Sequence, residues 1–67
     1  MNEDNIKLEV AIEIMASKLA NMIQKGYTTE DKEIQDLLKE KTQMYAGNKE
    51  IIEKILEVYG KELKNTL

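Results

Sequence analysis

The chain has 67 residues and a formal net charge of −3, from 10 Lys and 13 acidic residues, and it contains no Arg, His, Cys or Pro. A chain of this length forms one domain and buries only about 60% of the surface that its unfolded form exposes, so its core depends on close packing or self-association. Without Cys or His, a disulfide-stabilised scaffold and the usual kind of zinc site are both excluded.

The sequence also indicates where the chain acts. Its N-terminus is acidic and lacks the pattern of a secretory signal, and no apolar run approaches the roughly 20 residues that a membrane helix needs. We therefore expect a soluble cytoplasmic protein. The basic residues are all Lys, and Ile and Asn are frequent, which suggests a small protein from an AT-rich bacterium or its phage.

The first predicted helix covers residues 4–25. Apolar residues recur at steps of four and three, as one face of an amphipathic helix requires: Leu8, Ile12, Met15, Leu19 and Met22, with Ala11 and Ile23 widening the face. Gly26 suits a left-handed position that ends the helix, with the side chains of Met22 and Tyr27 in contact across the end.

The second predicted helix covers residues 29–46. Thr28 and Asp31 have the spacing of a capping box, which favours a helix start at this point. The apolar stripe that follows contains one charged residue, Lys41, whose methylene groups can cover apolar surface while the ammonium reaches water. The stripe consists of Ile34, Leu37, Leu38, Lys41, Met44 and Tyr45.

The third predicted helix covers residues 49–65, with Asn48 as its N-cap. Its apolar arc consists of Ile51, Ile52, Ile55, Leu56, Tyr59 and Leu63. Gly60 interrupts this arc at a cost of roughly 1 kcal/mol relative to Ala. The helix either ends at Tyr59 or continues through Gly60, and Leu63 favours continuation.

These elements predict an all-α fold, a small antiparallel three-helix bundle in a single domain of residues 1–67, with loops of two or three residues. The bundle is either a self-sufficient monomer or a homodimer that pairs through the first helix.

The stretch around Gly47 invites comparison with the helix-turn-helix of DNA-binding proteins. Those proteins place a small residue four positions before the turn Gly and apolar residues one and six positions after it. Here the three positions hold Gln43, Asn48 and Glu53. No segment of the chain is basic, whereas DNA binding depends on Lys and Arg that neutralise phosphates. We interpret Gly47 as a structural joint between two packed helices and expect no nucleic-acid partner.

The sequence offers no catalytic site. Acid–base and nucleophilic chemistry draw mostly on His, Cys, Ser or shielded carboxylates, and the single Ser, Ser17, has no candidate base. Glu9 and Glu13, and likewise Glu53 and Glu57, are one helical turn apart, but without His we interpret these pairs as solvated acidic faces. We therefore expect no enzyme activity, metal or cofactor.

The candidate functional residues are Ile6, Val10 and Ile14, which recur every four residues beside the main stripe of the first helix. We call this row the α-ridge and expect it to face solvent or a partner. The sequence predicts a regulatory or protein–protein interaction module that binds itself or another protein, with no membrane partner. An oligomeric nucleic-acid-binding regulator, and a small phosphotransfer regulator using Gln35 or Gln43, stay open as alternatives.

Overall fold

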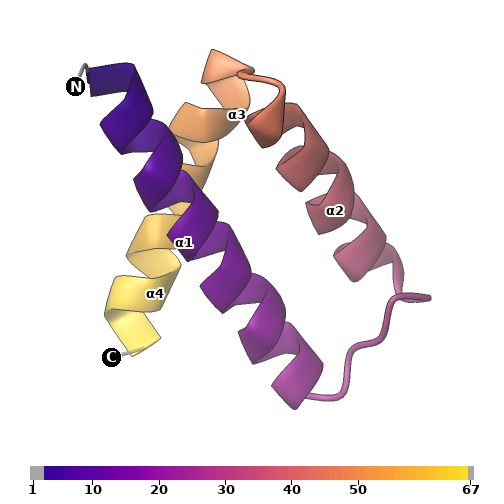
Figure 1. Ribbon diagram of the computed structural model, residues 1–67. Coiled ribbons are helices and arrows are strands. Elements are labelled where there is room, and N and C mark those ends of the chain that lie inside the picture. Colours follow the sequence, from indigo (N-terminus) through magenta and orange to yellow (C-terminus); the bar gives the residue numbers. More distant parts are fainter. Residues whose placement is uncertain (1–2, 67) are drawn as a thin grey trace.

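The computed structural model describes residues 3–66, and the side chains of residues 5–64. Three helical rods form the molecule (Figure 1): α1 is Glu3–Gln24, α2 is Lys32–Tyr45, and the C-terminal helix consists of α3 (Lys49–Lys54), a π-helical turn η1 (Ile55–Tyr59) and α4 (Gly60–Thr66). The predicted all-α three-helix bundle is confirmed.

The core lies where the three rods meet. α1 packs on α2 along one side and on η1 along another, and α2 also contacts α3. Toward the C-terminal end of α1, α2 and α4 diverge to opposite sides (Figure 1). The buried residues that pack together are Ala11, Met15, Leu37, Met44, Ile52, Ile55 and Tyr59. All of them belong to the apolar stripes read from the sequence.

The end of α1 has the geometry predicted from Gly26. Gly26 adopts φ 105°, the amide of Tyr27 donates to the carbonyl of Met22 at 3.1 Å, and the amide of Gly26 donates to the carbonyl of Ile23 at 3.0 Å. This pair of bonds is a Schellman motif, which satisfies two carbonyls at the end of a helix.

The start of α2 differs from the prediction: the helix begins at Lys32, three residues after the expected residue 29. Thr28 and Asp31 do bond to each other, because the Thr28 amide donates to the Asp31 carboxylate at 2.7 Å. The Asp31 amide in turn donates to the Thr28 carbonyl at 3.0 Å, so the four residues close a separate turn. Asp31 is extended, with ψ 138°, and the connection from α1 is longer than the two or three residues expected.

The joint between α2 and α3 is a second Schellman motif. Gly47 adopts φ 88°, and the amide of Asn48 donates to the carbonyl of Gln43 at 3.0 Å. Asn48 also caps α3, since its side-chain oxygen accepts from the amides of Glu50 and Ile51. One residue thus ends a helix and starts the next.

The C-terminal helix continues through Gly60, which has helical φ −61° and ψ −41°. The Gly60 amide donates to the carbonyl of Ile55, five residues earlier, and this widens the helix into a π turn. A Cβ added at Gly60 would lie 3.4 Å from Cδ1 of Ile14. An added methyl group would thus make an ordinary van der Waals contact with α1.

Three residues assigned to the apolar stripes are exposed rather than buried: Ile23, Leu38 and Tyr45. Each lies about 100° around its helix from a residue that packs in the core or against it, namely Met22, Leu37 or Met44. The C-terminal helix covers one side of α1 and α2, and these three side chains lie beyond its reach.

The same substitution to Ala should lower the free energy of unfolding at Gly47 and raise it at Gly60. Gly47→Ala forces a left-handed conformation on a residue with a Cβ, and we expect the free energy of unfolding to fall by about 1–2 kcal/mol. Gly60→Ala removes a flexible residue from a helix, and its methyl group makes only ordinary contacts, with the end of the Ile14 side chain and the carbonyl of Ile55, so we expect a gain of about 0.5–1 kcal/mol. Urea unfolding of both variants measures this, and a loss at Gly60 equal to that at Gly47 would contradict it.

Candidate functional site

The three residues of the α-ridge differ in their exposure to solvent. Ile6 and Val10 are 47% and 40% exposed, one turn apart on α1. Ile14 is half-buried and packs against the core, so it is less exposed than the other two residues of the ridge. Ile14 lies against the C-terminal helix at Gly60, since a Cβ built on Gly60 would be 3.4 Å from the Cδ1 atom of Ile14. The exposed part of the ridge is therefore Ile6 and Val10.

A surface ion pair lies on the side of α1 next to the exposed Ile6 and Val10. The ammonium of Lys7 lies 2.9 Å from the carboxylate of Glu53 on α3, and both side chains are about half exposed. Such a pair contributes at most about 1 kcal/mol to stability. It places a charged pair beside the apolar Ile6 and Val10.

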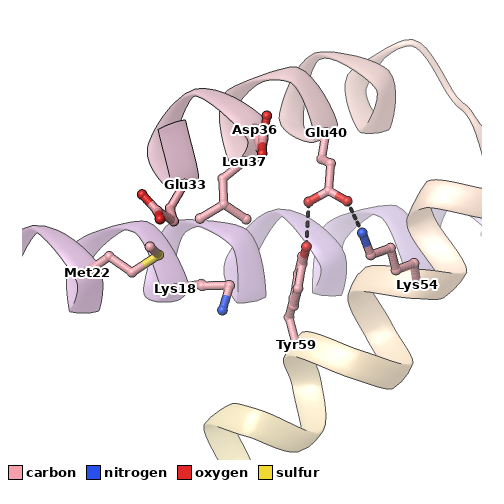
Figure 2. A pocket seen from close by; sticks show the side chains of 8 residues that line it. All are labelled: Lys18, Met22, Glu33, Asp36, Leu37, Glu40, Lys54 and Tyr59. Atoms are coloured by element: carbon pink, nitrogen blue, oxygen red, sulfur yellow. Dashed lines mark hydrogen bonds and ion pairs between the residues drawn. The ribbon is translucent and has the colours of Figure 1, made fainter. Parts of the chain in front are cut away.

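A second feature, which the sequence did not reveal, is an open groove along α1 between α2 and the C-terminal helix. Its lining residues come from all three rods (Figure 2): Lys18, Met22, Glu33, Asp36, Leu37, Glu40, Lys54 and Tyr59.

The carboxylate of Glu40 is the centre of this groove. It accepts a hydrogen bond from the Tyr59 hydroxyl at 2.5 Å, and it pairs with the ammonium of Lys54 (Figure 2). Glu40 belongs to α2 and its two partners to the C-terminal helix, so these bonds tie the two elements together. We call Glu40, Lys54 and Tyr59 the Glu40 clamp.

Lys18 of α1 completes the contacts around Tyr59. Its ammonium lies 4.6 Å from the centre of the Tyr59 ring and 2.6 Å from the carboxylate of Glu62. The ammonium of Lys54 lies 5.5 Å from the same ring. Cations over an aromatic face are attracted by its negative quadrupole, each by about 0.5–1 kcal/mol at exposed sites. The ring of Tyr59 is thus held by both charged neighbours as well as by its hydroxyl.

The clamp alters the ionisation of two of its members. The hydrogen bond with Glu40 raises the pKa of Lys54 above its usual value, because it stabilises the ammonium. The pKa of Tyr59 is also raised, mainly because burial disfavours the phenolate and then because its hydrogen bond to Glu40 holds the proton in place. Both groups are therefore kept in their protonated forms.

This chemistry is that of a structural clamp. The carboxylate of Glu40 has its charge matched by Lys54 and accepts hydrogen bonds from two donors, Lys54 and Tyr59. A sequence signal for the clamp was weak, because Glu40 and Lys54 lie on different helices and Tyr59 reads as a plain member of the apolar arc.

The acidic pairs noted in the sequence do not become part of a larger acidic cluster in the described structure. Within the part of the chain that the structure describes, no group of three or more acidic, His or Cys side chains comes together in a way that could hold a metal ion. Glu53 is instead engaged by Lys7.

None of the helices in residues 3–66 is long and apolar enough to cross a lipid bilayer. Comparison with protein-family models, with curated proteins and with solved structures finds no match. The functional argument therefore rests on the geometry of the chain itself.

Proposed function

We propose that the chain is a small protein–protein interaction module that presents an apolar helical face, and that it acts in the cytoplasm. The observation that carries the proposal is the exposure of Ile6 and Val10. Single exposed apolar residues are common on protein surfaces, but two β-branched side chains one turn apart form a continuous apolar strip. A helix or groove of a partner can bury such a strip with anchors every three or four residues.

The setting of the strip supports this function. Its neighbour Lys7 pairs with Glu53, so charged groups lie beside the strip, as they do around the apolar centre of an interface. The cytoplasm suits a chain without Cys, because no disulfide is needed to hold its fold.

The alternative of a nucleic-acid-binding regulator finds less support. Two Lys side chains that could otherwise contact phosphates are already paired: Lys54 with Glu40 and Lys18 with Glu62. Lys41 is half-buried. A titration of duplex binding with salt tests this alternative, since real binding weakens steeply as the salt concentration rises.

The interaction proposal is tested with a matched pair of Val→Glu variants. Val10 and Val58 are 40% and 46% exposed on different helices, so the two changes carry the same chemistry. We expect Val10→Glu to weaken binding of a natural partner by about 30-fold, which corresponds to about 2 kcal/mol, and Val58→Glu to leave it unchanged. Partner capture from the host followed by titration gives the comparison. Equal binding by both variants would show that the strip is not part of the interface.

A further inference from the structure

The groove that holds the Glu40 clamp extends beyond the clamp itself. Its volume is about 570 Å³, which lies within the roughly 300–1,000 Å³ of ordinary ligand sites. A second hollow of about 360 Å³ adjoins it on the α4 side, and Lys18, Met22 and Tyr59 line both. The groove therefore runs along the second half of α1, where α2 and α4 diverge (Figure 1).

The floor of the groove is apolar. Leu37 of α2 and Tyr59 of the C-terminal helix line its deep part and are buried. Met22 of α1 is only half-buried, so part of its flexible, polarisable side chain stays available for contact. A partner that reaches this floor can bury apolar surface in addition to pairing its charges.

The α2 wall of the groove carries a row of carboxylates. Glu33, Asp36 and Glu40 follow one another at steps of three and four residues, so they share one side of α2, and all three line the groove (Figure 2). Glu40 is paired with Lys54 of the C-terminal helix. Among the described side chains, neither of the other two carboxylates has an ion-pair or hydrogen-bond partner. Both are exposed, because the C-terminal helix diverges from α2 beyond the clamp (Figure 1).

The cations of the groove are already engaged. The ammonium of Lys18 lies 2.6 Å from the carboxylate of Glu62, and that of Lys54 pairs with Glu40. A further cation, Lys25, lines only the second hollow. The hollow beside α2 therefore has two unmatched negative charges and no unmatched positive charge.

This distribution of charge indicates which occupant fits. An apolar floor beside carboxylates at helical spacing is complementary to a helix that has an apolar face flanked by Lys or Arg. The Glu40–Lys54 pair already joins this row of acids to an ammonium on a neighbouring helix, and a basic helix in the groove would continue the pairing to Asp36 and Glu33. The net charge of −3 attracts such a partner at long range and opposes a second copy of the chain.

We propose that the groove between α2 and α4 binds a basic amphipathic helix of another protein, which adds a fourth helix to the bundle. The groove is separate from the Ile6–Val10 strip, since the strip lies in the first half of α1 and the groove along the second. The proposal therefore does not depend on the interaction assigned to the strip.

The probe is a fluorescent helical peptide of about 18 residues, or five turns, with Leu along one face and Lys on both sides of that face. Fluorescence anisotropy measures its binding to the full chain at low ionic strength. We expect a Kd of about 10 μM or tighter. A peptide with Glu in place of every Lys, and one with the same residues in scrambled order, should bind at least about 10-fold more weakly.

Two double variants of the chain test the site. Glu33→Gln/Asp36→Asn removes the two unmatched charges and should weaken binding of the basic peptide by at least about 10-fold. Glu9→Gln/Glu13→Gln removes two exposed carboxylates from α1 outside the groove, and we expect a change of less than about threefold. All four positions are exposed, so the fold should be kept, and circular dichroism checks this.

Amide NMR spectra recorded with the basic peptide locate its site without any substitution, and we expect shifts at residues 18–22, 33–40 and 59–62. Failure of the peptide to bind would overturn the proposal, as would equal weakening by the two double variants or shifts confined to residues 6–13. Sedimentation equilibrium of the chain alone tests the other occupant. A dimer whose dissociation shifts the amides of the groove would mean that a second copy fills it, contrary to the proposal.

Discussion

Replacing Ile55 with Ala should lower the free energy of unfolding by about 2–5 kcal/mol, because the side chain is fully buried where the three rods meet and its removal leaves a cavity. A domain of this size has a total stability of roughly 3–10 kcal/mol at 0.05–0.15 kcal/mol per residue. The variant should therefore lose a large part of its stability and unfold at a clearly lower urea concentration than the wild type. Urea unfolding followed by far-UV circular dichroism measures the loss.

Val58 provides the control for this substitution. It lies three residues further along the same π turn and is also β-branched, but it is 46% exposed. Val58→Ala should change the free energy of unfolding by less than about 0.5 kcal/mol. A similar loss for both variants would mean that the π turn does not direct Ile55 into the core as described.

The second large effect is expected at the Glu40 clamp. Tyr59→Phe keeps the ring and its contacts with Lys18 and Lys54 but removes the hydroxyl that donates to Glu40. A hydrogen bond to a charged group is worth about 1.5–3 kcal/mol, and we expect a loss near the lower end because Glu40 is partly exposed. Tyr45→Phe is the matched control, since Tyr45 is 56% exposed and should show almost no change.

The stabilising effect of the clamp should also depend on pH. The pKa values of Tyr59 and Lys54 are both raised in the folded chain, so the folded state holds these protons more tightly than the unfolded state does. Their contribution is fully present below the unfolded values, about 10 for Tyr and 10.4 for Lys. It is lost as the pH rises through the higher folded values.

Unfolding experiments at several pH values measure this linkage. The difference in stability between the wild type and Tyr59→Phe should be constant up to about pH 9 and should shrink above pH 10. A difference that grows as the pH rises would show that the clamp favours the phenolate, contrary to the raised pKa of Tyr59.

Much of the fold follows from local patterns that act within one helix. The stripes of α1 and of the C-terminal helix predicted most of the core, including Met15 and Ile55, because a period of 3.6 residues decides which side chains share a face. Gly26 and Asn48 predicted helix boundaries for a similar reason. A left-handed position and an N-cap are each satisfied by hydrogen bonds to residues a few positions away.

Local patterns were misleading where a turn competed with a helix. Thr28 and Asp31 have the spacing of a capping box, but their hydrogen bonds close a separate turn and α2 starts only at Lys32. Both structures satisfy the same backbone groups. The choice between them depends on the path that the connection from α1 to α2 takes across the bundle.

By itself the sequence determined that this protein is an all-α three-helix bundle, because helical periodicity and helix capping are local properties of the chain. Only the tertiary structure decided which parts of the apolar surface remain available. Ile14 packs against the core beside Gly60 while Ile6 and Val10 stay exposed, and the packing of α2 against the C-terminal helix assembles the Glu40 clamp. These features join residues far apart in the chain, so they depend on how the helices pack and not on the pattern within any one of them.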